Sequence, residues 1–199
     1  MDPDVYAYLL QVCTNTKSLA QGKRVHEHML HSIVEDNLLL VGKLVAMYAM
    51  FQSLDDTRLV FEKTPSNQQH AFLWNAMIKG CVQNELWEEA VQIYGQMHKA
   101  GIQPESYTFS SVLRACIVLA HIQHGKEIHT HIIINALQSN LLVGNVLVTL
   151  YAQCQRIVLA HQVFENMCER DVVSWTSIIV ENAQCGSLNE ALNLFGQME

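Results

Sequence analysis

The sequence predicts an all-α protein, built as a solenoid of short antiparallel helix pairs. Two observations lead to this fold class. Apolar residues recur at the spacing of amphipathic helices, with no sustained alternation that would indicate strands. The chain also repeats itself in units of about 31–35 residues, a length typical of helical repeat proteins. A single pair cannot bury its apolar face alone, so neighbouring pairs must stack into a continuous core.

A doubled phrase reveals the repeat. The segment LLLVGKLVAMYAMF at 38–51 recurs, with substitutions, as LLVGNVLVTLYAQC at 141–154. The same offset aligns Cys13 with Cys116 and His26 with His129. After an insertion within 64–70 the offset shortens, and Trp74 then aligns with Trp175. A large unit therefore covers the chain almost twice.

The helices follow from the apolar stripes and their breaks. Trp74, Met77, Ile78 and Cys81 recur at helical steps, and the equivalent stripe returns in each later unit. Glycine and proline fall between the stripes, where helices should stop. The expected array covers residues 1–199 as six pairs: 3–37, 38–70, 71–105, 106–140, 141–171 and 172–199. The last pair stops short of a full unit, which predicts that the natural protein continues past Glu199.

Composition and net charge restrict the classes of function that the chain can have. Half of the 199 residues are hydrophobic and 16% are charged, as expected for a folded chain. The formal net charge is −7, which excludes nucleic-acid binding through bulk positive charge and leaves only a local surface. No apolar run reaches the roughly 18 residues of a membrane span, and the acidic start MDPDVYAYLL does not look like a transit peptide.

Cysteines and histidines give no metal motif. None of the six cysteines forms a CxxC pair, and most sit at apolar helical positions, so reduced core thiols are expected. The HEH and HTH clusters place His26 and His129 at the same point of the repeat. A packing or capping role is expected for both, and we expect no metal and no cofactor.

The motifs resemble those of the pentatricopeptide repeat family, and more narrowly its plant PLS class. WNAMIKGCVQNELWEEAVQIYGQMHKAGIQPE (74–105) looks like the standard motif, as does WTSIIVENAQCGSLNEALNLFGQM. SYTFSSVLRAC with GKEIHTHII resembles the long motif, and LLVGNVLVTLYAQC with AHQVFENMCERD the short one. Long, short and standard motifs thus alternate twice. The resemblance implies a right-handed α-solenoid superhelix of about six repeats, the last one truncated.

The resemblance also implies sequence-specific binding of single-stranded RNA, with one base per repeat. In the family, the fifth residue of the first helix hydrogen-bonds the base edge and the last residue of the repeat assists. The second residue wedges between neighbouring bases. Stacking of this kind contributes about 1–3 kcal/mol per base without a strongly basic surface.

Asn145 and Asp171 are the clearest reading pair. They occupy the fifth and last places of the motif 141–171, where the family pattern resembles a pyrimidine reader that prefers uridine. An amide carries both a donor and an acceptor, so it can match a pyrimidine edge. Asn75 with Glu105 departs from the usual pair, with a pyrimidine as the best expectation. Ser110 resembles part of an adenine reader.

The remaining reading positions are weaker. Asn140 is the expected partner of Ser110, but the two lie in a long motif, where the code is less dependable. Ala7 with Asn37 also lies in a long motif, and alanine has no side-chain group that could hydrogen-bond a base. Gly42 with His70 offers no side chain at the fifth place, although a slip of one residue would bring Lys43 there. That repeat is predicted to read no particular base. Thr176 has its partner beyond the chain end. The candidate wedges, for which a core role is the alternative, are Leu39, Phe72, Tyr107, Leu142 and Val173.

No motif in the sequence indicates an enzyme. The chain has no P-loop, no GxSxG and no HxE followed by PCxxC, although family members of this class often carry a deaminase-like domain after the repeats. The resemblance implies that this chain is the RNA-targeting part of an organellar RNA-processing factor, a C-to-U editing factor, in chloroplast or mitochondrion.

Two alternatives stay open beside RNA targeting. One is a scaffold that binds a peptide or an accessory editing protein, and the other is an architectural spacer. Apolar residues such as Leu192 and Phe195 at the truncated end would favour self-association.

Overall fold

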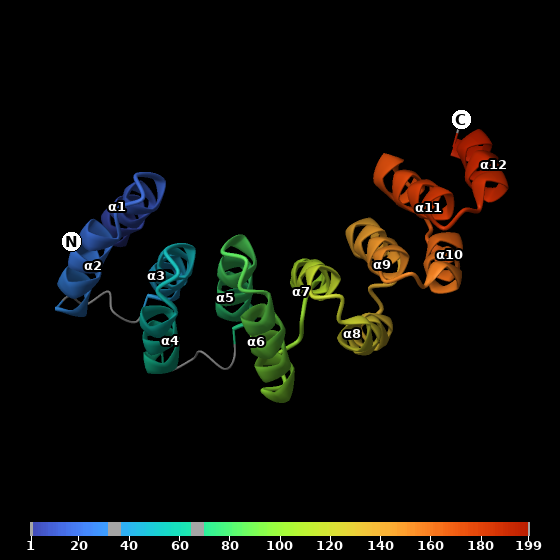
Figure 1. Ribbon diagram of the computed structural model, residues 1–199. Helices are drawn as coiled ribbons and strands as arrows, with labels where there is room; N and C mark the ends of the chain where they lie inside the picture. Colours follow the sequence, from blue (N-terminus) through green and yellow to red (C-terminus); the bar gives the residue numbers. More distant parts are fainter. Residues whose placement is uncertain (1, 32–36, 65–69, 199) are drawn as a thin grey trace. The chain divides into compact units, whose positions relative to one another are not determined.

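The computed structural model describes residues 2–31, 37–64 and 70–198. Twelve helices and no strands occur in these described ranges, so the predicted all-α class is confirmed (Figure 1). The chain divides into two compact units, Met1–Pro104 and Glu105–Glu199. Each unit contains six of the described helices. The two units are described separately below.

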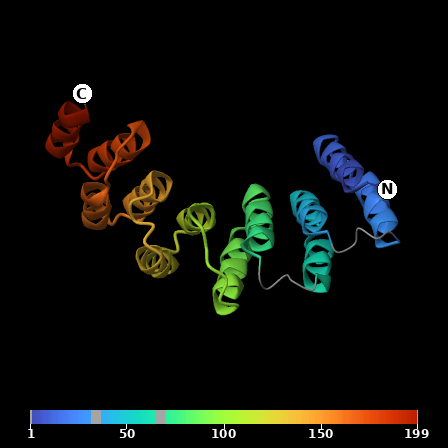
Figure 2. The same cartoon turned by 180° about the vertical axis from the view of Figure 1, so that it is seen from behind.

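The first unit consists of three helix pairs. Its helices are α1 Pro3–Asn15, α2 Leu19–Leu30, α3 Leu38–Met50, α4 Leu54–Lys63, α5 Ala71–Gln83 and α6 Trp87–Lys99. The first helices of the pairs pack side by side, with α3 between α1 and α5 (Figures 1 and 2). Each second helix packs against its own first helix. The unit therefore has two layers, and α1, α3 and α5 form one of them.

The second unit repeats this plan. Its helices are α7 Ser106–Val118, α8 Ile122–Ile134, α9 Leu141–Gln153, α10 Ile157–Asn166, α11 Val172–Gln184 and α12 Leu188–Met198. Here α9 packs between α7 and α11 (Figure 1). Phe109, Leu113, Val143 and Leu147 on α7 and α9 are at most 2% exposed, so the stripe expected from the sequence faces the core.

Side-chain caps fix where several first helices begin. Asn37 Oδ1 accepts the amides of Leu39 at 3.1 Å and Leu40 at 3.2 Å. Asn140 Oδ1 accepts the amide of Val143 at 3.2 Å. Asp2 caps α1 in the same way through the amide of Asp4. Caps of this kind satisfy backbone donors that the first helical turn leaves unpaired.

A left-handed residue follows the first helix of every pair. These residues have φ between 52° and 80° and are Lys17, Gln52, Glu85, Ala120, Gln155 and Gly186. Only the last is a glycine, the residue that adopts this conformation without steric cost. Five of the six turns therefore place a residue with a Cβ in a backbone conformation that carries a steric cost.

Tyrosine–histidine hydrogen bonds join neighbouring pairs inside each unit. His26 Nδ1 on α2 lies 2.9 Å from Tyr48 Oη on α3, and His129 Nδ1 on α8 lies 2.9 Å from Tyr151 Oη on α9. Burial lowers the pKa of His129 and raises that of Tyr151. Burial, with Asp56 and Glu27, raises the pKa of Tyr48 to about 12. Both histidines thus have the packing role expected of them.

The cysteines only partly follow the expectation of core thiols. All six are free, and Cys13, Cys81 and Cys116 are buried. Cys154 is half-buried, but Cys168 and Cys185 are exposed. Burial raises the pKa of Cys81 to about 11 and that of Cys116 to about 12. Those two thiols are held neutral and act as small apolar side chains.

Candidate nucleic-acid interface

The structure brings Asn145 and Asp171 together. Asn145 lies on α9 and is 7% exposed, and Asp171 is the N-cap of α11. The Nδ2 amide of Asn145 donates to Asp171 Oδ1 at 3.0 Å. The two residues are 26 positions apart in sequence, and the stacking of α9 against α11 makes them neighbours.

Asp171 is held as a carboxylate by the start of α11. Its Oδ1 also accepts the backbone amides of Val173 and Ser174, both at 3.0 Å. The amide of Ser174 is the main cause of a pKa below the ordinary value, and the Asn145 amide adds to it. All recorded hydrogen bonds of the carboxylate end on Oδ1. The second oxygen, Oδ2, is thus left available as an acceptor.

The orientation of the Asn145 amide follows from this partner. If the amide were turned over, its oxygen would face a carboxylate oxygen at hydrogen-bond distance, which is repulsive. The Oδ1 atom therefore points away from Asp171, and it is buried with no hydrogen-bond partner. Leaving a buried acceptor unpaired costs about 1–3 kcal/mol, which a donor from a ligand could recover once neighbouring side chains admit it.

The equivalent position in the first unit is closed. Gly42 on α3 is buried, and a Cβ built on it would overlap the ring of Phe72 on α5, with Phe72 Cζ at 2.7 Å. His70, the N-cap of α5, makes no side-chain capping bond. Lys43 Nζ donates to Gln11 Oε1 on α1 at 3.5 Å. Gly42, Lys43 and His70 make no hydrogen bond with one another.

Other predicted reading residues make different hydrogen bonds or none with their expected partners. Ser110 is 7% exposed and its hydroxyl donates to the Tyr107 carbonyl at 3.0 Å, while Asn140 is occupied as a cap. Ala7 is half-buried on α1, and Asn37 caps α3. Neither of these pairs is joined by a hydrogen bond.

Three further reading positions are placed individually. Asn75 is half-buried on α5 in the first unit. Glu105 is the exposed N-cap of α7 in the second unit, and its backbone amide donates to Thr108 Oγ1 at 3.0 Å. Thr176 is exposed on α11.

The five candidate wedges share one environment. Each is a large apolar side chain near the start of a first helix, and each is about half exposed: Leu39 54%, Phe72 51%, Tyr107 50%, Leu142 47% and Val173 55%. Apolar side chains of this size are usually buried when they serve the core. Their exposure argues against the alternative core role and leaves them free to contact a ligand.

Charge is divided unevenly between the two layers of helices. The first helices carry the cations Lys43, Lys79 and Arg114 and the carboxylates of Asp4 and Glu181, of which Glu181 is buried. The second helices carry an excess of carboxylates, including Asp55, Asp56, Glu88 and Glu89. Three further carboxylates, those of Asp2, Glu105 and Asp171, cap the starts of α1, α7 and α11, so the layer that holds the reading positions is not basic.

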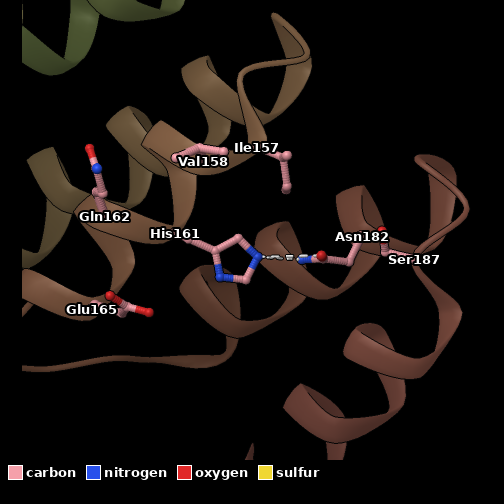
Figure 3. Close-up of a pocket in the computed structure, with 7 residues that line it drawn as sticks. All are labelled: Ile157, Val158, His161, Gln162, Glu165, Asn182 and Ser187. Atoms are coloured by element: carbon pink, nitrogen blue, oxygen red, sulfur yellow. Dashed lines mark hydrogen bonds between the residues drawn. The ribbon is translucent and has the colours of Figure 1, made fainter.

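A surface hollow in the second unit lies between α10, α11 and the turn before α12. It has a volume of about 350 Å³, and Ile157, Val158, His161, Glu165 and Asn182 are among its lining residues. His161 Nε2 and Asn182 Nδ2 are 3.0 Å apart in its wall (Figure 3). No group of side chains suited to a metal ion occurs in the described residues, and no helix described there is long and apolar enough to cross a bilayer.

Comparisons with known proteins identify the family. A model described as the PPR repeat family matches residues 70–117, and one described as the PPR repeat matches 173–199. A pentatricopeptide repeat-containing protein of Arabidopsis thaliana is 36% identical over 199 residues. A second from the same plant, named as chloroplastic, is 32% identical over 197 residues. The chain is a pentatricopeptide repeat protein. The two matches cover 100% and 99% of this chain. They cover only 39% and 37% of the relatives' own lengths, so the chain spans well under half of each relative.

Solved structures agree with the solenoid fold of this pentatricopeptide repeat chain. The crystal structure of PPR10 from maize covers 100% of the chain with a TM-score of 0.68 at 18% identity, and the chain covers 29% of it. PPR10 in complex with an 18-nt psaJ RNA element covers 99% with a TM-score of 0.75 at 17% identity, with 30% of that chain covered. At these identities the likeness shows the fold, and the solenoid prediction is confirmed.

Sequence reasoning missed the capping role of the last residue of each repeat. Asn37, Asn140 and Asp171 were expected as assistants in base reading, and each is the N-cap of the next first helix. A signal was present in the sequence, because asparagine and aspartate directly before an apolar run are N-cap residues. These positions therefore combine a structural task with any contact to a ligand.

Proposed function

We propose that this pentatricopeptide repeat chain is the single-stranded RNA-binding module of an organellar RNA-processing factor, reading about one base per repeat. The observation that carries the proposal is the Asn145–Asp171 pair. It offers a buried amide of fixed orientation with an unpaired acceptor, next to a carboxylate oxygen that is also unpaired.

The pair suits a pyrimidine edge. Asn145 Oδ1 would accept the N3–H of uracil, and the remaining proton on Nδ2 would donate to a carbonyl of the same base. The Asp171 partner holds the amide in the required orientation before the base arrives, so little entropy is lost on binding. Half-exposed Leu142 and Val173 would pack against the faces of the base, since they are the second residues of α9 and α11, the helices that carry the pair.

The repeat architecture extends the proposal to the other first helices. In this account the repeats are 3–37, 38–70, 71–105, 106–140, 141–171 and 172–199, of the long, short and standard kinds of the PLS class. Asn75 with Glu105 and Ser110 with Asn140 contribute weaker preferences, and Ala7, Asn37, Gly42, Lys43, His70 and Thr176 contribute little selectivity.

The wider role is the targeting of C-to-U RNA editing in chloroplast or mitochondrion. PLS-type motif order and the chloroplastic names of two relatives support it. In this role the chain contributes binding and not catalysis, and accessory editing proteins are further partners.

Fluorescence anisotropy tests the RNA proposal. The chain is titrated into labelled single-stranded oligonucleotides of varied sequence, at two salt concentrations, with duplex RNA for comparison. We expect saturable binding to single strands only, and we expect it to weaken in Asn145→Ala/Asp171→Ala. Asp2→Ala is the matched control, because it removes a helix N-cap without touching the pair. Equal weakening by the control, or equal binding of duplex, would overturn the proposal.

A protein-interaction scaffold is the second candidate, and one observation favours it. On α12 the side chains of Leu188, Leu192 and Phe195 are 62%, 69% and 54% exposed. Their spacing along α12 places these side chains on one helical face, and an exposed apolar face favours docking of a protein or of a further helix pair. Binding of a peptide or a second copy of the chain would be lost in Leu192→Glu/Phe195→Glu and retained in Asn145→Ala/Asp171→Ala.

A further inference from the structure

Two hydroxyl side chains lie one helical turn beyond the starts of α9 and α11 that form the reading site. Thr149 follows Asn145 by four residues on α9, and Ser177 follows Val173 by four residues on α11. Both hydroxyl side chains are half-buried, and α9 packs against α11. Thr149 Oγ1 and Ser177 Oγ are 3.3 Å apart. Helix stacking thus places a pair of hydroxyl oxygens on the helical face that holds Asn145.

The protons of these hydroxyls are donated to the backbone. Thr149 Oγ1 donates to the Asn145 carbonyl at 2.8 Å, and Ser177 Oγ donates to the Val173 carbonyl at 2.9 Å. A hydroxyl has one proton to donate and two lone pairs that accept. These two contacts are shorter than the contact between the hydroxyls, and they use both protons. The two oxygens therefore face each other as acceptors, and a donor from a ligand would bridge them.

The packing of first helices does not require this pair. The position of Thr149 corresponds to Ala46 in the doubled phrase, and that of Ser177 corresponds to Ala76 once the offset has shortened. In the first unit α3 and α5 nevertheless pack side by side, as α9 and α11 do in the second. The hydroxyls are therefore an addition at the position that also carries Asn145.

The ninth place of a first helix is also where cations occur. Thr149 is the ninth residue of α9, and the ninth residues of α5 and α7 are the exposed Lys79 and Arg114. Cationic side chains in a nucleic-acid interface contact phosphates. In the proposed complex the base meets the fifth place and the phosphates meet the ninth, so the ribose that joins them passes beside Thr149.

We propose that Thr149 and Ser177 bind a ribose 2′-hydroxyl and make this position selective for RNA over DNA. The inference rests on the proposed function and adds recognition of the sugar to recognition of the base. Phosphate oxygens within a strand carry no proton and would be repelled by two acceptors, and deoxyribose has no 2′-hydroxyl. The 2′-hydroxyl is both a donor and an acceptor, so it is the group of the RNA backbone that can bridge the pair.

A scan of single 2′-deoxynucleotides tests the inference. An RNA selected from a random single-stranded pool with the natural chain is synthesised with deoxyribose at each position in turn, and fluorescence anisotropy measures each affinity. The nucleotide read by Asn145 is identified by the pyrimidine preference that Asn145→Ala removes. We expect deoxyribose at this nucleotide or its immediate neighbour to weaken binding about three- to tenfold, because one hydrogen bond is lost.

Hydroxyl variants decide whether this pair causes the penalty. In Thr149→Val/Ser177→Ala the penalty should disappear, while the pyrimidine preference stays, because valine keeps the shape of threonine and Asn145 is untouched. Thr149→Ser keeps the hydroxyl and should retain the penalty. Each single variant, Thr149→Val or Ser177→Ala, keeps one oxygen and should show a reduced penalty, which provides the test if the double variant does not fold.

The matched control lies outside the first helices. Thr130→Val on α8 removes a bond of the same kind, from Thr130 Oγ1 to the Lys126 carbonyl, and should leave the penalty unchanged. Circular dichroism and thermal unfolding verify that each variant is folded.

The two ways in which the inference can fail are distinguishable. A penalty that survives in Thr149→Val/Ser177→Ala, or that falls equally in Thr130→Val, would overturn sugar recognition by this pair and leave RNA binding intact. The absence of any penalty at or beside the nucleotide read by Asn145 would do the same. No binding of single-stranded RNA by the natural chain would overturn the inference together with the proposed function.

Discussion

At the scale of single residues, the buried side-chain amide of Asn145 is better suited to recognising a ligand than to stabilising the fold. Asn145 is nearly enclosed, yet one of its two polar atoms has no partner. A residue that served only the fold would gain from an apolar side chain of similar volume at this place. The retained polar atom is therefore the best support in the structure for a ligand at this position.

Asn145→Ala should accordingly have small effects on stability and large effects on binding. The free energy of unfolding should change by less than about 1 kcal/mol, because an unpaired acceptor is removed together with one hydrogen bond. Affinity for a preferred RNA should fall about 5–150-fold, or about 1–3 kcal/mol. Urea unfolding and anisotropy on the same preparation measure the two quantities. Thr130→Ala, which removes a hydroxyl bonded within its own helix α8 and lies at no reading position, is the control.

His129 gives a pH dependence at the same scale. Burial lowers its pKa below the ordinary value of 6.5, so the folded chain binds this proton less readily than the unfolded chain. Its contribution to stability is complete above that ordinary value and declines as the pH falls below it. Thermal unfolding between pH 7.5 and pH 5.5 should reveal the decline, over roughly the range in which histidine titrates. His129→Phe should flatten it, whereas exposed His124→Gln should leave it unchanged.

At the scale of elements, the turn after each first helix limits stability. Five of the six turns place a residue with a Cβ in the left-handed region, at an intrinsic cost of about 1–2 kcal/mol each. Ala120→Gly should raise the free energy of unfolding by only about 0.5–1 kcal/mol, since glycine also gains freedom in the unfolded chain. Gly186→Ala is the reverse experiment. Nothing lies within 4 Å of the added Cβ, so its expected destabilisation, measured by urea unfolding, reports the backbone alone.

At the same scale, the sequence predicts the helices themselves but not the contacts between successive first helices. The helix type, the pairing and the apolar faces followed from the spacing of residues such as Phe109, Leu113 and Leu147, because that spacing is local. The overlap of a Gly42 Cβ with Phe72, and the approach of Asn145 to Asp171, depend on how successive first helices stack. Helix stacking distances are not encoded in the period of the sequence, so only the structure could reveal these two contacts.

At the scale of the whole molecule, an acidic chain can bind RNA if stacking and edge recognition, and not bulk charge, supply most of the affinity. The described first helices offer only three cations, Lys43, Lys79 and Arg114. If all three met phosphates, the slope of log affinity against log salt would be about −2. Anisotropy at a series of salt concentrations measures it. A slope several times steeper would mean that binding depends on bulk charge and not on stacking and edge recognition.

The most direct test of the account is a thermodynamic cycle between one base and one side chain. A selected single-stranded RNA and its variant, with a purine replacing the preferred pyrimidine, are each titrated against the natural chain and Asn145→Ala. We predict that the natural chain prefers the pyrimidine by about 5–150-fold and that the preference falls close to one in Asn145→Ala. An undiminished preference in Asn145→Ala would contradict the claim that this amide reads the base.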